Sequence, residues 1–304
     1  MDLESLRIFV DLAETKSFSK TAARNFVSQS AVSQRIRALE IDLGHTLVER
    51  GKGRPGATFT DAGLRLLTGG RDLLERTDAL RREMAALGDE VSGTLRVATV
   101  YTIGLHALPP ALSAFLAEYP QVNLHLEYLR TDRIYEALLT GAIDLGIVAL
   151  PQPRPKIEII PLHEEPMVLI LPPTHPLAAR ASGGGDDQAP AIALSELQGL
   201  PFIAFDHDIP TRKMTDDLLQ TRGVSVNIVQ AFDNIETIKR VVEIGPGIAI
   251  VPYPTIRREV RDGTLVARPL AGENFTRPTG ILLKKGRVPG NALRRFIETL
   301  RGHS

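Results

Sequence analysis

The residues with the clearest chemical potential lie in one short segment, from Ser28 to Arg37. On a helix of about 100° per residue, its polar side chains fall on one face, within about 40–140° of Gln29. They are Ser30, Ser33, Gln34 and Arg37. Hydroxyl, amide and guanidinium groups can hydrogen-bond to base edges in the major groove of DNA. A polar outer face is also typical of any surface helix, but this face carries no acid before Glu40.

Apolar residues must anchor this helix from its other side. Four of them fall between about 280° and 340° on the same scale and predict a buried face. They are Val32, Ile36, Leu39 and Leu43. Ser28 is placed to cap the helix, and Gly44 is placed to end it.

Two shorter helical patterns precede this helix. Residues 3–13 repeat apolar side chains at helical spacing. A second helix is expected to start with Ser19 as its cap and to bury Ala22, Ala23 and Phe26, before a turn through residues 25–27. A short helix, a tight turn and a longer helix together predict a helix-turn-helix.

A basic hairpin pattern follows Gly44. Residues 47–50 and 57–59 predict two short strands around a Gly- and Pro-rich tip. From Lys16 to Arg54 the chain has eight basic residues and three acidic ones. Such a surplus suits a phosphate backbone, and the hairpin could place Lys52 or Arg54 in a minor groove. The alternatives are a solvated basic surface and an ordinary solvated loop.

A leucine repeat marks the long helix that we expect after Thr60. Leucines recur every seven residues, at Leu66, Leu73, Leu80 and Leu87. Such a heptad pattern favours pairing between helices of two chains. The alternative is a linker helix packed on its own domain, and Gly69–Gly70 weakens the middle of the repeat. A dimer would present two recognition helices to DNA half-sites about 34 Å apart.

Together, the first ninety residues resemble the winged helix-turn-helix of LysR-type transcriptional regulators. The resemblance rests on SFSKTAARNFVSQSAVSQRIRALEIDLG (17–44), LVERGKGRPGATFTDAG (47–63) and the long helix that follows. It implies that Gln29, Ser30 and Ser33 contact bases and phosphates of double-stranded promoter DNA, and that Arg54 enters a minor groove. Gln34 and Arg35 stand in the reverse of the family's commoner order, and Ser30 replaces a common Pro, which bears on base preference.

From Thr94 onward, strand and helix patterns alternate. The predicted strands are 95–100, 124–129, 144–150, 167–171, 202–205, 228–232, 248–251 and 281–283. The predicted helices are 104–118, 133–140, 211–221, 234–244 and 291–301. This alternation predicts parallel sheets covered by helices.

Ligands of open α/β sheets bind at the carboxyl ends of the strands, where helix N-termini present free N–H groups. That rule selects Thr99, Tyr101, Thr102, Thr131, Phe205, Asp206 and Asn234. Hydroxyl groups beside helix N-termini suit a small anion or a carboxylate. The alternative is that these residues only cap helices.

This second region resembles the LysR effector domain, which has the fold of type 2 periplasmic binding proteins. The resemblance rests on TLRVATV (94–100), LTGAIDLGIV (139–148) and FDNIETIKRVVEIGPGIAIVP (232–252). The two resemblances divide the chain into a DNA-binding domain (1–59), a linker and dimerisation helix (60–92) and an effector-binding domain (93–304). They place lobe I at 93–162 and 270–304, and lobe II at 163–269. They imply tetramers built from two dimers.

Patterns expected of an enzyme or a metal site are missing from the sequence. The chain has no Cys, and its seven His residues lack metal-ligand spacing. It has no phosphate loop, no G-x-S-x-G elbow and no dinucleotide fingerprint. We therefore expect no catalytic residue, no metal and no cofactor. An enzyme on this fold would need a paired acid and base, and a solute-binding protein would need an export signal in place of residues 1–90.

The N-terminal residues lack the pattern of a signal peptide, and no apolar run approaches the ~18 residues of a membrane span. We expect a cytoplasmic protein with no membrane partner. Its predicted fold class is an all-α winged helix-turn-helix with a long linker helix, followed by a two-lobed α/β domain. Its predicted partners are promoter DNA, a small anionic effector and further copies of itself as a homodimer or homotetramer.

Overall fold

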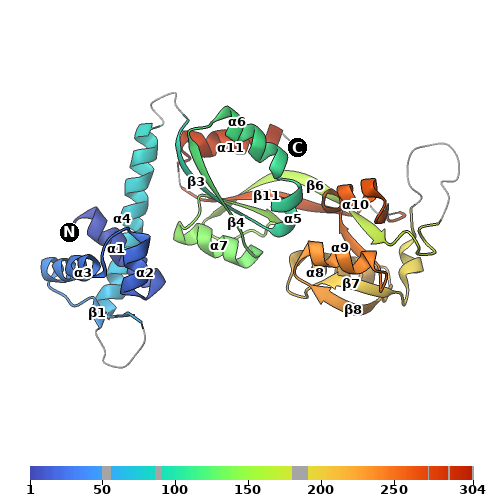
Figure 1. Cartoon of the computed structure of the whole chain (residues 1–304), viewed down its shortest axis with the longest axis horizontal. Coiled ribbons are helices and arrows are strands. Elements are labelled where there is room, and N and C mark those ends of the chain that lie inside the picture. The colour runs from blue at the N-terminus through green and yellow to red at the C-terminus, as the bar shows by residue number, and fades with distance from the viewer. Residues whose placement is uncertain (50–55, 86–90, 180–190, 273, 287, 303–304) are drawn as a thin grey trace. The chain divides into compact units, whose positions relative to one another are not determined.

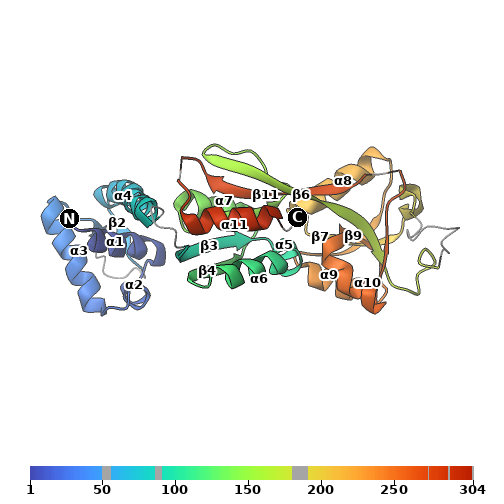
Figure 2. The same ribbon diagram turned by 90° about the horizontal axis from the view of Figure 1, so that it is seen from above.

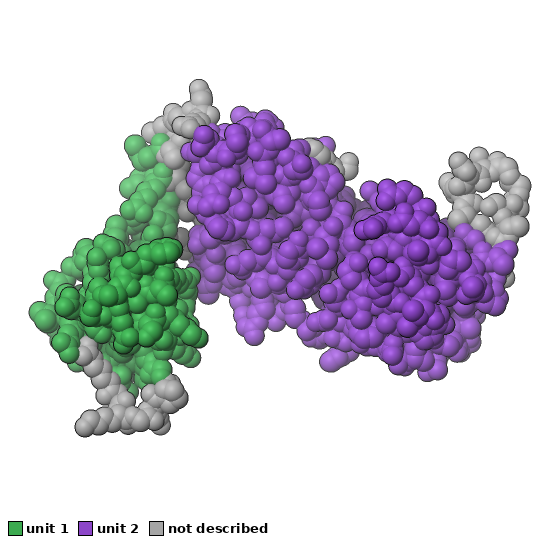
Figure 3. All heavy atoms as spheres, viewed as in Figure 1, with its two compact units in different colours: residues 1–89 green, residues 90–304 purple. Residues whose placement is uncertain are grey.

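A computed structural model of the chain describes residues 1–49, 56–85, 91–179, 191–272, 274–286 and 288–302. The chain forms two compact units, residues 1–89 and residues 90–304 (Figure 3). No helix within the described ranges is long and apolar enough to cross a membrane.

The first unit is a helix-turn-helix followed by a small hairpin and a long helix (Figure 1). Its elements are α1 (Leu3–Thr15), α2 (Phe18–Arg24), α3 (Gln29–Leu43), β1 (Val48–Glu49), β2 (Thr58–Phe59) and α4 (Asp61–Ala85). Ser28 caps α3 as predicted, because its side chain accepts a hydrogen bond from the Ala31 N–H. β1 and β2 pair antiparallel, with Val48 opposite Phe59.

The core of this unit joins α1 to α3. Ile8, Phe9 and Leu12 of α1 pack with Val32, Ile36 and Leu39 of α3, and Leu47 closes the cluster. Burial of these apolar faces is the main force that fixes α3 against the rest of the unit. The periodic pattern of α3 therefore predicted its buried face correctly.

The predicted cap of the second helix and the predicted burial of Ala23 and Phe26 are wrong, whereas the turn over residues 25–27 is present. Ser17, not Ser19, caps α2, and its side chain accepts a hydrogen bond from the Lys20 N–H. Phe26 is 96% exposed instead of buried. The helix ends at Arg24, and Phe26 then adopts a left-handed backbone conformation with φ of 54°. The turn directs its side chain away from the core, where the neighbouring Val27 packs instead.

The long helix α4 packs on its own unit near its start and is exposed further along. Thr60 caps it by accepting a hydrogen bond from the Gly63 N–H. Leu66 packs against the core of its own unit. Leu73 and Leu80 are 45% and 58% exposed. Leu87 lies outside the described residues.

The second unit is built on a seven-stranded mixed sheet and a separate two-stranded one. The order of the large sheet is β10-β6-β11-β5-β3-β4, with β9 added on β6, and β7 pairs with β8. The strands are β3 (Gly93–Thr99), β4 (Val122–Tyr128), β5 (Leu145–Ala149), β6 (Ile157–Leu171), β7 (Pro201–Phe205), β8 (Asn227–Phe232), β9 (Ala249–Pro252), β10 (Val266–Arg268) and β11 (Thr276–Lys284).

Helices cover these strands in two lobes. They are α5 (Tyr101–His106), α6 (Pro109–Glu118), α7 (Thr131–Thr140), α8 (Pro210–Thr221), α9 (Ile235–Glu243), α10 (Arg257–Asp262) and α11 (Asn291–Gly302), with short 3₁₀ turns η1 (Leu194–Leu197) and η2 (Tyr253–Ile256). In the first lobe, α6 and α11 cover one face of the sheet and α7 covers the other (Figure 1). The second lobe contains β7 to β10 with α8 to α10.

Two long strands connect the lobes (Figures 1 and 2). The first part of β6 pairs with β11, and its last part pairs with β9 and β10. The parallel pairing predicted from sequence is present within each lobe, between β3 and β4, β3 and β5, and β7 and β8. β11 instead runs antiparallel to both β5 and β6.

The sequence indicated only the apolar ends of these connecting strands, at 167–171 and 281–283. Prolines and charged residues interrupt the apolar pattern elsewhere, including Pro161, Glu165 and Arg277. The predicted helix over 104–118 is divided for a related reason, because Pro109 begins α6 and α5 stops at His106. The predicted lobe boundaries at residues 163 and 270 stay a prediction.

Candidate nucleic-acid interface and ligand cavity

The outer face of α3 presents the polar side chains selected from the sequence. Ser28, Gln29, Ser30, Gln34 and Arg37 are exposed, and Ser33 is half-buried. On the opposite face of the same helix Val32, Ile36 and Leu39 are buried, and Leu43 is half-buried. The helix thus presents hydroxyl, amide and guanidinium groups to solvent, as a groove-reading helix requires.

Local hydrogen bonds organise the start of this face. Ser28 and Ser30 share a hydrogen bond of 2.8 Å between their hydroxyl groups. Ser19 of α2 donates to the Gln29 side-chain oxygen at 2.9 Å. This bond uses the amide oxygen of Gln29, and its amide nitrogen remains a donor.

The charged residues of α3 differ in their partners. Arg35 forms an ion pair with Glu4 at 2.8 Å, so it is turned toward α1. Arg37 has no hydrogen-bond or ion-pair partner among the described residues. Glu40, the first acid on the helix, accepts hydrogen bonds from the N–H groups of Leu47 and Val48 at 2.8 and 3.2 Å. Its carboxylate therefore holds the hairpin and does not oppose DNA from the outer face.

The hairpin tip lies outside the described residues, and Arg54 lies there with it. The described part of the hairpin, β1 and β2, is joined to α4 through Thr60, which donates to the Thr46 carbonyl at 2.7 Å. The prediction for Arg54 therefore stays a prediction.

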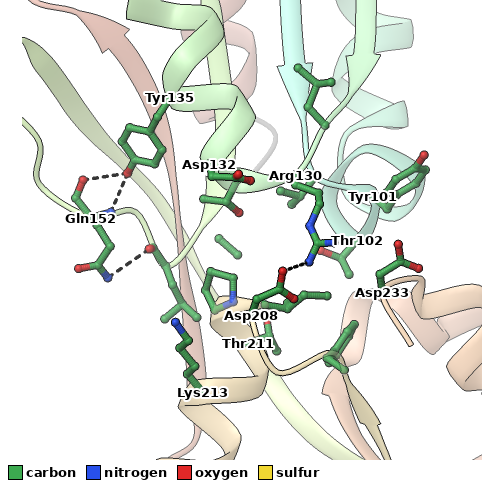
Figure 4. Close-up of a pocket in the computed structure, with 18 of the residues that line it drawn as sticks. Tyr101, Thr102, Arg130, Asp132, Tyr135, Gln152, Asp208, Thr211, Lys213 and Asp233 are labelled. Carbon is green, nitrogen blue, oxygen red and sulfur yellow. Dashed lines mark hydrogen bonds and ion pairs between the residues drawn. The ribbon is translucent and has the colours of Figure 1, made fainter. Parts of the chain in front are cut away.

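A cavity of about 420 Å³ opens between the two lobes of the second unit (Figure 4). Its walls include the start of α5, the start of α7 and the loop after β5 from the first lobe. The start of α8 and Asp233 contribute from the second lobe. Pockets of this size accept small organic ligands.

Four of the seven predicted ligand residues line this cavity: Tyr101, Thr102, Thr131 and Phe205. The other three do not line it. Thr99 is fully buried. Asp206 follows β7, where its N–H donates to the Phe232 carbonyl. Asn234 caps α9 by accepting from the Glu236 N–H at 2.8 Å, which is the helix-cap role that sequence left open.

A buried ion pair forms part of the cavity wall and was not found from sequence. Arg277 of β11 and Glu165 of β6 are each 1% exposed. The Arg277 Nε donates to Glu165 Oε2 at 2.9 Å, and its Nη2 donates to the same oxygen. The remaining donors reach Thr211 Oγ1 at 3.1 Å and Thr102 Oγ1 at 3.3 Å. Because Thr102 belongs to the first lobe and Thr211 to the second, one guanidinium connects both.

A second ion pair crosses between the lobes at the cavity. Arg130, the residue before α7, donates to Asp208 before α8 at 2.5 Å (Figure 4). Both side chains are about half exposed, so solvent screens this pair. Its strength therefore depends on ionic strength more than that of the buried pair.

A third interlobe contact involves His106 of α5. Its Nε2 lies 2.8 Å from Glu236 Oε1, and Lys239 Nζ lies 2.8 Å from the same oxygen and 2.8 Å from Glu259 Oε1. Burial lowers the pKa of His106, and the nearby Lys239 charge lowers it further, against the attraction of Glu236. Because the pKa of His106 is lower in the folded chain, the unfolded chain binds a proton at His106 more readily. The folded state therefore loses stability as the pH falls below 6.5.

Lys239 has a structural role in this network. It is buried and also donates to the Thr255 carbonyl at 3.0 Å. Within the described ranges no group of three or more His, Asp or Glu residues could hold a metal ion.

A helix-turn-helix joined to a two-lobed α/β unit with an interlobe cavity defines a class of ligand-responsive transcriptional regulators. Family models bear this out. Residues 3–64 match the bacterial regulatory helix-turn-helix of the lysR family, and residues 88–304 match the LysR substrate binding domain. The chain belongs to the LysR family of transcriptional regulators.

Similar proteins are regulators, not enzymes or transporters. A probable RuBisCO transcriptional regulator of Synechocystis is 31% identical over 97% of this chain and 84% of its own length. A probable hydrogen peroxide-inducible genes activator of Mycobacterium avium is 30% identical over 93% of this chain and 88% of its own.

Solved structures share the fold. Full-length OxyR of Pseudomonas aeruginosa superposes with a TM-score of 0.75 at 24% identity, covering 100% of this chain and 94% of that one. Full-length CbnR complexed with its target DNA gives a TM-score of 0.64 at 24% identity, covering 100% of both chains.

Proposed function

We propose that this chain binds double-stranded promoter DNA as a homodimer or homotetramer and that a small anionic effector in the interlobe cavity modulates this binding. The observation that carries the proposal is the division of α3 into a buried apolar face and an exposed polar face without a free carboxylate. We propose the domain division 1–59, 60–92 and 93–304 for these roles.

The proposed DNA contacts are Ser28, Gln29, Ser30, Ser33, Gln34 and Arg37 of the α3 segment, with Arg54 from the hairpin. Hydroxyl and amide groups would read base edges, and the arginines would contact a base or phosphates. The DNA-bound CbnR structure supports this proposal by its shared fold.

Replacing Arg37 by alanine is expected to weaken DNA binding about 10- to 100-fold, since a good base or phosphate contact from Arg contributes that much. Ser33→Ala is expected to weaken it about 2- to 10-fold, as one neutral hydrogen bond is lost. Both side chains lie on the outer face, so the thermal unfolding midpoint should stay the same. Fluorescence anisotropy with labelled DNA from the chain's own promoter region, over a series of salt concentrations, measures the effect.

Arg35→Ala is the matched control. This substitution removes the same charge from the same helix, but Arg35 is paired with Glu4. It should cost clearly less affinity than Arg37→Ala. Unchanged DNA binding by folded Arg37→Ala protein would remove α3 from the interface.

We propose that the exposed part of α4 pairs two chains. Leu73 and Leu80 offer apolar side chains to solvent, and the neighbouring Met84 is 61% exposed. Of the four predicted seam residues, Leu66 instead contacts its own unit, and Leu87 lies outside the described residues. A seam of exposed leucines at heptad spacing is typical of a helix that pairs with another.

The double variant Leu73→Asp, Leu80→Asp is expected to disrupt this pairing, because buried carboxylates would face each other across the seam. Its mass by light scattering should fall by half or more, and its affinity for a full promoter site should fall with it. Leu64→Asp is the control, since Leu64 is exposed on the same helix but off the heptad. An unchanged mass of the double variant would place the dimer interface elsewhere.

We propose that the effector lies against the starts of α7 and α8, with Tyr101, Thr102, Thr131 and Phe205 in its wall. Neither helix has a side-chain cap at its start, so the first N–H groups of α7 stay available to an anion. In α8 the Thr211 N–H stays available, whereas Pro210 has no N–H and the Arg212 N–H donates to the Ile209 carbonyl at 3.0 Å. An effector that prefers one arrangement of the lobes would shift the regulator toward that arrangement.

A bound anion is expected to raise the thermal unfolding midpoint of the full chain and to change its affinity for promoter DNA. Saturation at a hundredfold excess over Kd adds about 2.7 kcal/mol, or about 5–10 °C for a unit of this size. Thr102→Ala should reduce the shift, and Thr140→Ala at the far end of α7 should not. Dye-based thermal unfolding against a panel of small carboxylates measures both, and an equal shift with Thr102→Ala would remove Thr102 from the site.

A further inference from the structure

The charges that line the cavity are mixed, not uniformly positive. Four basic residues line it, and three acidic ones do: Arg130, Arg154, Lys213 and Arg277 against Asp132, Asp208 and Asp233. Two of the basic residues are already matched, Arg130 by Asp208 and Arg277 by the buried Glu165. A ligand with only negative charges would therefore meet unpaired carboxylates in the same cavity.

Asp132 and Lys213 are the opposite charges best placed to hold a ligand between the lobes. Asp132 lies in the first turn of α7, and Lys213 lies in the first turn of α8. Figure 4 shows Asp132 on the α7 side of the cavity and Lys213 on the α8 side. Over the described part of the chain, neither side chain has a hydrogen-bond or ion-pair partner.

The position of Lys213 is unfavourable without an anion. The start of a helix carries a partial positive charge, which a nearby cation opposes. The first turn of α8 contains no acidic residue to offset it. An anionic group bound beside Lys213 would satisfy both the ammonium and the helix terminus.

The cavity also suits a body of hydrocarbon between two charged ends. Leu150, Phe205 and Ile209 line it together with Tyr135. The Arg154 guanidinium stacks over the Tyr135 ring, with its Cζ 4.1 Å from the ring centroid. Tyr135 is itself fixed, because its hydroxyl donates to the Gln152 carbonyl and accepts from the Gln152 N–H.

We infer that the effector is amphoteric, with a carboxylate held by Lys213 and the Thr211 N–H at the start of α8, and an ammonium group held by Asp132. The inference rests on the proposed function, in which this cavity binds the effector, and it adds a positive charge to the anionic effector named there. Each end of such a ligand belongs to a different lobe, so binding both ends draws the lobes together. Arg130 and Asp208 already join the lobes by the same pairing of opposite charges.

Matched trios of compounds test the inference with the full chain. Each trio contains an amino acid, the acid that lacks its amino group and the amine that lacks its carboxylate. Examples with the two charges at opposite ends of a hydrocarbon chain are 5-aminopentanoate, pentanoate and butan-1-amine, and 6-aminohexanoate, hexanoate and pentan-1-amine. Thermal unfolding identifies the trio that binds, and titration calorimetry gives its three Kd values.

In at least one trio, the compound with both charges is expected to bind at least 10-fold tighter than either partner. Asp132→Asn should weaken that compound about 10- to 100-fold and leave the acid nearly unchanged. Lys213→Gln should weaken the compound similarly and leave the amine nearly unchanged. Asp217→Asn is the control, because Asp217 is an exposed carboxylate of α8 outside the cavity. Unfolding midpoints without ligand verify that all variants fold.

The outcomes separate this inference from the proposed function. One outcome is that the acids bind tightest, shift promoter affinity and bind the Asp132→Asn variant at least as well. This outcome would overturn the amphoteric ligand but would leave the proposed effector cavity in place. Tight binding of an amphoteric compound that Asp132→Asn leaves unchanged would also overturn it. If no compound of any class shifts unfolding or promoter affinity, the amphoteric ligand and the effector proposal both fail.

Discussion

Arg277→Met is expected to lower the free energy of unfolding of the second unit by about 3–5 kcal/mol. Removing one partner of a buried ion pair leaves the other charge uncompensated, which is the costly case. Glu165, which is 1% exposed, would then lose the Arg277 guanidinium that pairs with it. Its Oε1 already has no hydrogen-bond partner in the described structure. Thr102 and Thr211 would also lose the donor that connects the lobes.

Calorimetry of the full chain measures this loss as a shift of the transition that belongs to the second unit. The double variant Glu165→Leu, Arg277→Met should recover much of the stability, because no unpaired charge remains. Arg240→Met is the matched control, since Arg240 pairs with Glu243 on the surface and solvent screens that pair. If Arg277→Met and Arg240→Met lower the free energy of unfolding equally, the buried ion pair contributes no more to stability than the surface pair.

The second large effect is expected from Gly63→Ala in the first turn of α4. A Cβ built at this position would lie 2.2 Å from the Leu47 carbonyl oxygen, which is backbone and cannot rotate away. The helix start and the hairpin would have to separate, and overpacking of this kind costs about 1–3 kcal/mol or more. Since Glu40 binds Leu47 and Val48, DNA affinity should fall together with the stability of the first unit.

Two other glycines of α4 provide the controls. A Cβ at Gly69 would meet nothing within 4 Å, so Gly69→Ala should stabilise the first unit by about 1 kcal/mol through helix propensity. A Cβ at Gly70 would lie 2.8 Å from the end of the flexible Leu6 side chain, so Gly70→Ala should fall between these two. Urea unfolding followed by circular dichroism ranks the three. Equal stability of Gly63→Ala and Gly69→Ala would rule out the contact between α4 and the hairpin.

The helix-turn-helix was predictable because its signals are local. Apolar spacing alone set the buried face of α3, and Ser28 capped it as expected. The errors nearby came from a turn. Sequence spacing assigned Phe26 to a buried face, but the left-handed conformation at that residue turned it outward.

The cavity was predictable only in part. The rule that ligands bind at strand ends identified Tyr101, Thr102, Thr131 and Phe205, because it depends on local strand and helix order. The same rule selected Thr99, which is fully buried. It could not identify the ion pairs, because Arg277 and Glu165 are 112 residues apart and meet only through the register of β6 and β11.

The amino-acid pattern by itself determined which face of α3 is buried and where most helices form, but not the division into α5 and α6 or the presence of α10. Those features depend on hydrophobic periodicity and capping, which act within a few residues. Only the tertiary structure decided which charges face the cavity and which partner each one has. Arg130 meets Asp208, and Asp132 stands opposite Lys213, because two lobes with separate cores are joined by β6 and β11. Electrostatic pairing depends on distance in space, and no spacing along the chain encodes it.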